Sequence, residues 1–119
     1  MSVWAEFAEC IYNLSPDFHM HVRTRKIRES AVQAYLIAKI RAAGGFAVKI
    51  ESPSRRGIPD VLIIWRRFTL FVEVKMSTRS KPSAIQSLTI REMREAGGHV
   101  TVVSGKAEAD DYLLWLQRL

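Results

Sequence analysis

The sequence predicts a single α/β domain, in which a mixed β-sheet is flanked by helices in the order α-β-β-β-α-β-α. Three observations predict this class. A long stretch with helical apolar periodicity comes first, and three short apolar or alternating runs typical of strands follow it. A second helical stretch then separates these runs from a last strand, which is typical of a crossover connection. At 119 residues, one domain can bury about two thirds of its unfolded surface.

Composition excludes several classes of protein. The chain is 48% apolar and 25% charged, as in an ordinary soluble globular protein, and no apolar run approaches the roughly 20 residues that cross a bilayer. The first residues lack the basic start of a signal peptide. Cys10 is the only cysteine, so an internal disulfide is excluded and an intracellular, cytoplasmic protein with a reduced thiol is expected.

The charge balance points to a polyanionic partner. Lysine and arginine number 18 against 12 aspartate and glutamate residues, giving a net charge of +6. A small basic protein without a membrane segment most often binds nucleic acid, although many ordinary proteins are also basic.

The first helical stretch is preceded by an extension of uncertain structure, residues 1–25. Its apolar residues recur at helical spacing and Ser15–Asp17 is a turn signal, so a short helix and a loosely attached arm both fit. The domain itself is expected over residues 26–119. Within it, residues 26–43 carry one apolar stripe at steps of three and four, and Gly44-Gly45 ends that helix.

Three strands and one basic loop are expected next. Residues 46–52 alternate in polarity, and a loop rich in turn formers follows at Pro53–Gly57. Two β-rich runs, Asp60–Trp65 and Thr69–Val74, then flank Arg66-Arg67 and contain neither glycine nor proline. A hairpin between these two runs is the simplest interpretation.

The last part of the chain repeats the helix and strand signals. A basic polar loop precedes Ser83, which can cap a helix over residues 84–96 that ends at Gly97-Gly98. A strand is expected over residues 99–104 and a final helix over about 107–117.

Two carboxylates and a lysine interrupt the apolar hairpin. If the chain turns between Arg66 and Arg67, Asp60 lies directly opposite Glu73, where Cβ atoms are about 4.5–5.5 Å apart. An Arg-Arg pair is poor chemistry for a two-residue turn, and a four-residue connection around the same centre would keep the pairing. Like charges repel at this distance, and a divalent cation between them would reverse the sign of the interaction. Because side chains alternate along a strand, Glu73 and Lys75 share one face.

This arrangement suits chemistry on a phosphate. Two carboxylates favour Mg²⁺ or Mn²⁺, which accept phosphate oxygens as further ligands. Lys75 could orient or deprotonate an attacking water, or stabilise developing negative charge. The flanking basic loops could bind neighbouring phosphates through Arg55, Arg56, Arg79 and Lys81.

Each feature also has a structural interpretation. A single aspartate at a strand start usually caps a turn, and Glu-x-Lys on a strand is usually a solvated ion pair. Both features together, in apolar strands about a dozen residues apart, are much less common. The combination therefore favours catalysis.

The motifs resemble those of the PD-(D/E)xK nuclease superfamily, and most of all its VRR-NUC branch of small virus-type replication and repair nucleases. The resemblance covers roughly Lys26 to Trp115 and rests on four stretches: "RESAVQAYL", "GIPD", "EVK" and "SAIQ". It implies a restriction-endonuclease-like core. It also suggests a virus- or phage-encoded protein, which would act inside the host cell.

The resemblance also implies roles for particular residues. Asp60 and Glu73 would hold the metal, with the Val74 backbone carbonyl as a further ligand, and Lys75 would be the catalytic lysine. Glu29 would project from the first helix toward the metal, directly or through water. Gln86 would approach the site from the helix after the hairpin. Gln33, one helical turn after Glu29, could support the site.

Two functions remain open from the sequence. The first is a Mg²⁺- or Mn²⁺-dependent DNA endonuclease that hydrolyses phosphodiester bonds. By resemblance alone, it would be a homodimer that acts on branched DNA such as four-way junctions. The second is a non-catalytic, basic nucleic-acid-binding module, in which the acidic residues simply pair with arginines.

Overall fold

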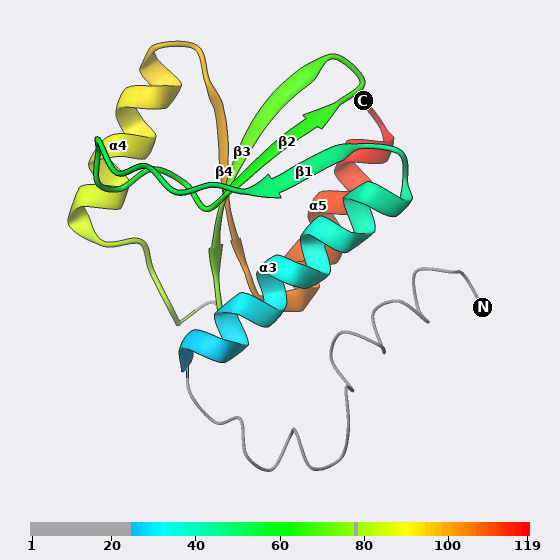
Figure 1. The fold of residues 1–119 in the computed structure, drawn as a ribbon, viewed down its shortest axis with the longest axis horizontal. Helices are drawn as coiled ribbons and strands as arrows, with labels where there is room; N and C mark the ends of the chain where they lie inside the picture. Colours follow the sequence, from blue (N-terminus) through cyan, green and yellow to red (C-terminus); the bar gives the residue numbers. More distant parts are fainter. Residues whose placement is uncertain (1–24, 78) are drawn as a thin grey trace.

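A computed structural model describes residues 25–77 and 79–119 of the chain (Figure 1). The expectations for residues 1–24, including the state of Cys10, lie outside this range. Seven elements follow in the predicted order α-β-β-β-α-β-α: α3 (Arg25–Ala42), β1 (Phe46–Lys49), β2 (Val61–Trp65), β3 (Phe68–Lys75), α4 (Ala84–Glu95), β4 (His99–Ser104) and α5 (Gly105–Gln117).

The four strands form one mixed sheet in the order β1-β2-β3-β4. The first three strands are antiparallel and joined in sequence, whereas β4 pairs parallel to β3. A parallel neighbour needs a crossover connection, and α4 supplies it. The predicted α/β class with a mixed, restriction-endonuclease-like sheet is therefore confirmed.

Helices α3 and α5 pack side by side on one face of the sheet (Figure 1). Their fully buried residues Leu36, Ile40 and Leu116 join the alternate strand residues in one hydrophobic core, which includes Val61, Ile63, Leu70, Val72 and Val74. Residues between these on each strand point to the opposite face of the sheet, since side chains alternate. Helix α4 lies toward that opposite face, because its Gln86 contacts Glu73, which alternates with Val72 and Val74.

The hairpin between β2 and β3 turns in two residues. Trp65 pairs with Phe68 and Val61 with Val72, so the register centred between Arg66 and Arg67 is confirmed. Both arginines have positive φ, 46° and 76°, as a type I′ turn requires. The reluctance of arginine to adopt this conformation is offset by long-range contacts of Arg66.

Those contacts tie the hairpin tip to the end of α5. The Arg66 guanidinium donates to the carbonyl oxygens of Gln117 and Leu119, at 3.3 and 2.8 Å, and also lies over the Trp65 ring. Tertiary interactions therefore override the local turn preference, and the four-residue alternative is wrong. Among the described residues, no helix is both long enough and apolar enough to traverse a bilayer.

Candidate active site

Asp60 lies one residue before β2 begins, and two hydrogen bonds fix its position. Its backbone carbonyl accepts from the Ile50 amide at 2.7 Å, which extends the β1–β2 ladder by one pair. Its carboxylate Oδ2 accepts from the Val74 amide at 3.0 Å. Strand β3 extends beyond the point where β2 begins, so β2 offers no backbone carbonyl to Val74. The Asp60 carboxylate accepts from the Val74 amide in its place. Asp60 is thereby held at the level of Glu73, as the register predicts.

Glu73 is a buried carboxyl in the middle of this arrangement, with only 1% of the residue exposed. Its Oε2 accepts a hydrogen bond from the Gln86 side-chain amide at 2.9 Å, whereas its Oε1 has no hydrogen-bond partner among the residues that the structure describes. Burial, and then the neighbouring Asp60 carboxylate, raise the pKa of Glu73 to about 8, against an opposing effect of Lys75. The negative charge of Glu73 is therefore unfavourable at this position unless a cation lies nearby.

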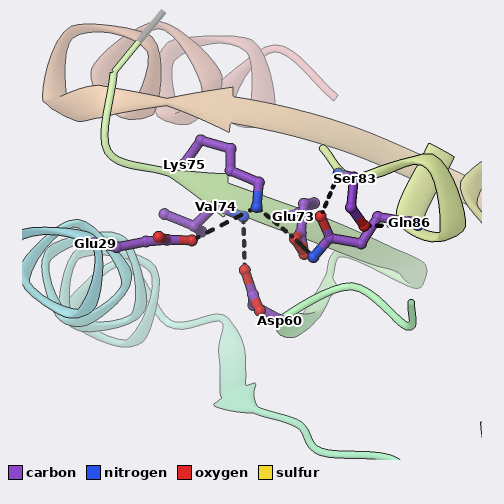
Figure 2. A network of polar contacts seen from close by, with 7 residues as sticks. All are labelled: Glu29, Asp60, Glu73, Val74, Lys75, Ser83 and Gln86. Atoms are coloured by element: carbon purple, nitrogen blue, oxygen red, sulfur yellow. Dashed lines mark hydrogen bonds and ion pairs between the residues drawn. The ribbon is translucent and has the colours of Figure 1, made fainter. Parts of the chain in front are cut away.

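Lys75 lies between two acidic side chains (Figure 2). Its Nζ is 3.8 Å from Glu73 Oε2 and 3.8 Å from Glu29 Oε1. Glu29 projects from α3 and Gln86 from α4, so residues from three elements meet at this end of β3. The predicted shared face of Glu73 and Lys75 is confirmed.

Gln86 reaches the site from the first turn of α4, where Ser83 is the predicted N-cap. The Ser83 hydroxyl accepts from the Gln86 amide nitrogen at 3.2 Å, and the Gln86 side-chain oxygen accepts from the Ser83 amide at 2.9 Å. These reciprocal bonds form a capping box. The sequence predicted Ser83 as the cap but not the reciprocal bond from its amide to Gln86. The Ser-x-x-Gln spacing, which is typical of a capping box, could have indicated this bond.

The loop before Asp60 is attached to the same helix. The buried Thr89 hydroxyl donates to the Arg56 carbonyl at 3.2 Å. Gly57 has φ +84°, and a Cβ there would lie 2.7 Å from both the Ile85 carbonyl oxygen and Thr89 Oγ1. Only glycine permits this contact without strain. Sequence reasoning missed the role of Thr89, since an isolated helical threonine gives no signal of a long-range partner.

Comparisons with known proteins agree with this geometry. The chain is 38% identical over 82 residues to a protein of Acyrthosiphon pisum secondary endosymbiont phage 1 named "Putative nuclease p44", covering 66% of this chain and 84% of that protein. A solved structure described as a VRR_NUC domain superposes with a TM-score of 0.68 at 33% identity, over 72% of this chain and 94% of that one.

The chain belongs to the VRR-NUC family of nucleases. A second solved VRR_NUC domain protein, only 17% identical, shares the fold with a TM-score of 0.54, over 80% of this chain and 86% of that one. No family model matches the chain. As a VRR-NUC nuclease, the protein is a hydrolase that acts on nucleic acid.

The basic residues predicted for this VRR-NUC protein fall into two groups. Arg56, Arg79 and Lys81 are exposed on the loops that flank the site. Arg55 instead forms an ion pair with Glu92 of α4, a partner that only the fold brings near. Gln33 is buried on α3, with 8% of the residue exposed, and no hydrogen bond joins it to the site residues that the structure describes.

The VRR-NUC family implies a metal ion, and the oxygen donors of this site are the groups that could hold it. No group of three or more His, Cys, Asp and Glu side chains gathers closely enough to hold an ion within residues 25–77 and 79–119. Two carboxyl groups nevertheless meet here. One of them, Glu73, is buried, and one of its oxygens lacks a partner. A divalent cation would relieve both the repulsion and the missing interaction, so the residues present fit a hard cation with oxygen ligands.

Proposed function

We propose that the protein is a Mg²⁺- or Mn²⁺-dependent DNA endonuclease that hydrolyses phosphodiester bonds. One observation carries this proposal: a buried glutamate with an unpartnered oxygen, Glu73, lies beside the Asp60 carboxylate and the Lys75 ammonium group. Such an arrangement is destabilising in a protein without an ion, and its raised carboxyl pKa is typical of functional sites.

Three groups of this chain would hold the ion directly: the carboxylates of Asp60 and Glu73 and the backbone carbonyl of Val74. Glu29 would reach the ion through a water, because no three acidic side chains of the described residues gather closely enough to bind it together. The N–H and C=O of one strand residue point to the same edge, and Asp60 accepts from the Val74 N–H. The Val74 carbonyl therefore faces the edge where Asp60 lies. When bound, the ion would acidify a water and neutralise charge on the scissile phosphate.

Lys75 would act on the attacking water or on the phosphate. Its ammonium group is held 3.8 Å from each of Glu29 and Glu73, and only 13% of its side chain is exposed. This position limits its rotamers and keeps the positive charge beside the carboxylates. Lys75 can then orient the water, accept a proton from it when neutral, or stabilise the charge that develops on the phosphate.

Exposed basic residues would bind the DNA backbone on both sides of the site. Arg56 lies in the loop anchored to Thr89, and Arg79 and Lys81 lie in the loop after β3. Arg55 would have to share or leave its ion pair with Glu92, so its contribution should be smaller. Because the sequence offers no base-reading module, the substrate would be recognised by backbone and shape.

We further propose branched DNA, such as four-way junctions, as substrate and a homodimer as the active form. A two-fold dimer presents two sites to two strands, which suits paired incisions. The outer face of β1 and β2 offers an apolar surface for such contact, since Phe46 and its partner Ile64 are 52% and 43% exposed.

The direct test is a cleavage assay on labelled linear, flapped and four-way DNA with Mg²⁺, Mn²⁺ or EDTA. We expect metal-dependent products, most abundant on four-way DNA, that are lost in Asp60→Ala while DNA binding is kept. The mass of the protein in solution should be that of a dimer.

Several outcomes would contradict the proposal in part or in whole. Binding without cleavage under every metal would favour a non-catalytic binding module. Equal cleavage of all three substrates would contradict the selectivity for branched DNA, and a monomeric mass would contradict the dimer.

The basic loops can be tested through the salt dependence of DNA binding. Loss of Arg56 should make the slope of log K against log salt concentration shallower by about 1, and loss of Arg55 should change this slope by less.

A further inference from the structure

We propose that Ser83 is a positioning residue for the active site, which acts through Gln86 to hold the Glu73 carboxylate with its Oε1 free for the ion. This inference rests on the proposed metal-dependent function and goes beyond it, because the bonds that join Ser83 to the site run to Gln86 and not to an acidic residue. Figure 2 shows the chain of contacts from Ser83 through Gln86 to Glu73.

The first step in this chain is the orientation of the Gln86 side chain. Its oxygen accepts from the Ser83 amide at 2.9 Å, and its nitrogen donates to Glu73 Oε2 at 2.9 Å. A side-chain amide has one acceptor end and one donor end. Once the Ser83 N–H has bound the oxygen, the NH₂ group is the end left for Glu73, and it donates to Oε2. The capping box therefore decides which end of the amide reaches the site.

The second step concerns Glu73. Gln86 binds only one of its oxygens, and the other has no hydrogen-bond partner within residues 25–77 and 79–119. Anchoring Oε2 fixes the rotation of the carboxylate, so that Oε1 keeps its direction without a competing donor. A ligand oxygen whose direction is set in advance loses less conformational freedom when an ion binds.

The choice of glutamine supports this dual use. A glutamate at the third helical position also forms a capping box with serine, and would stabilise the helix through its negative charge near the N-terminus. A glutamate could not donate to Glu73, however, and would repel it. Glutamine serves both the cap and the carboxylate, and the cap alone does not account for it.

The test compares two ways of weakening α4, one at each end. Ser83→Ala removes the hydroxyl cap of the first turn. Gly97→Ala strains the end of the same helix, because Gly97 has φ +100°, and the added methyl group would disturb no neighbour since no atom lies within 4 Å of its Cβ position. Each change should lower the melting temperature by about 4–8 °C. Only the first loosens Gln86.

Two readouts separate positioning from stability. The first is Mn²⁺ affinity by titration calorimetry, which we expect to fall about three- to tenfold in Ser83→Ala and to stay within about twofold of wild type in Gly97→Ala. The second is the NMR signal of the Gln86 side-chain NH₂ in ion-free protein. This signal should move toward its free position in Ser83→Ala alone. Ser83→Thr keeps the hydroxyl, so the Mn²⁺ affinity and the Gln86 signal should both stay as in the wild type.

A stronger variant follows from the backbone. Ser83 has φ −64° and ψ 167°, which proline can adopt, so Ser83→Pro removes the N–H that orients Gln86 as well as the hydroxyl. We expect a larger loss of Mn²⁺ affinity, about tenfold or more. In a Gln86→Ala background, Ser83→Ala should cause no further loss of affinity, since the two residues act in series.

The outcomes distinguish this inference from the function on which it rests. If the wild type takes up no divalent ion, the proposed function fails. If the wild type binds the ion but both Ser83→Ala and Ser83→Pro, which also removes the N–H that holds the Gln86 oxygen, keep Mn²⁺ affinity as Gly97→Ala does, Ser83 has no positioning role and the proposed function stands.

Discussion

Two polar clusters in this protein are built from the same residue types and reach opposite electrostatic states. In the active-site cluster, Glu73 is buried, Lys75 lies 3.8 Å away, and the carboxyl pKa is raised to about 8. The second cluster joins α3 to α5. There Asp110 accepts from the Tyr35 hydroxyl and lies 3.2 and 3.3 Å from the ammonium groups of Lys39 and Lys106.

The second cluster is electrostatically complete. Burial alone would favour the neutral form of Asp110, but the hydrogen bonds from Tyr35, Lys39 and Lys106 outweigh it and lower the pKa of this carboxyl. Both lysines also lie over the Tyr35 ring. Every charge has a partner within the fold, which is what a structural cluster requires. Glu73, with repulsion from Asp60 and an oxygen that has no partner among the described residues, lacks this balance.

The largest expected effect follows from removing the charge of Glu73. Glu73→Gln should reduce cleavage by at least about 10³-fold, because the ion loses an anionic ligand. The same change should stabilise the ion-free protein at pH 8, since it removes a buried charge without removing much volume. Cleavage rates and thermal unfolding in EDTA measure the two effects. A variant that loses stability in EDTA would contradict the comparison.

The two lysines provide the next contrast. Lys75→Met should reduce the single-turnover cleavage rate by about 10²–10³-fold while metal uptake persists. Lys39→Met should leave the rate within about twofold, because Lys39 serves the structural cluster. If Lys75→Met cleaves at the normal rate, its catalytic assignment is wrong.

The carboxyl groups of the two clusters, Glu73 and Asp110, should change the free energy of unfolding over different pH ranges. The folded pKa of Glu73 is about 8 and its ordinary value is 4.5, so the folded state holds a proton that the unfolded state has released between these values. The stabilising contribution of protonated Glu73 to the free energy of unfolding is fully present below about pH 4.5. It is lost as the pH rises to 8, at no more than about 1.4 kcal/mol per pH unit.

The lowered pKa of Asp110 acts in the opposite sense. Its contribution is present above the ordinary value of 3.8 and is lost as the pH falls through the lower folded pKa. Urea unfolding in EDTA from pH 5 to 8 should therefore show a decline that Glu73→Gln removes and Asp110→Asn leaves unchanged. A flat wild-type profile would contradict the assigned state of Glu73.

The smallest effect is expected at the structural cluster itself. Asp110→Asn should lower the free energy of unfolding by about 1 kcal/mol, or the melting temperature by roughly 4–8 °C, because the charge-assisted bonds weaken. Cleavage at a temperature where the variant is folded should be unchanged. A specific loss of cleavage there would show that the two clusters are coupled.

These two clusters also show what a sequence can predict. The active-site residues lie on strands and helices with clear periodicity, so alternation and the hairpin centre were enough to place Asp60 opposite Glu73 and Lys75 beside it. Family motifs indicated Gln86. The Tyr35–Asp110 cluster was missed, because its members are far apart in sequence and each has a polar or amphipathic side chain that fits many environments.

Two arginines show contacts that sequence alone does not indicate. Arg66 and Arg67 are poor residues for a two-residue turn, yet bonds from Arg66 to carbonyls at the end of α5 stabilise that turn. Arg55 was predicted to bind phosphate, and its ion pair with Glu92 on α4 is a contact that the sequence did not indicate. In both cases an arginine found a partner that is near only in the folded chain.

The mixed sheet also has a consequence for the order of folding. The β1–β2–β3 meander uses contacts close in sequence, which form with a small loss of chain entropy, whereas β4 must wait for the crossover through α4. Glu73 pairs with Val102 of β4 and receives its amide donor from α4. Its dehydration is therefore expected late, after the folding transition state, and ionising Glu73 should accelerate unfolding more than it slows refolding.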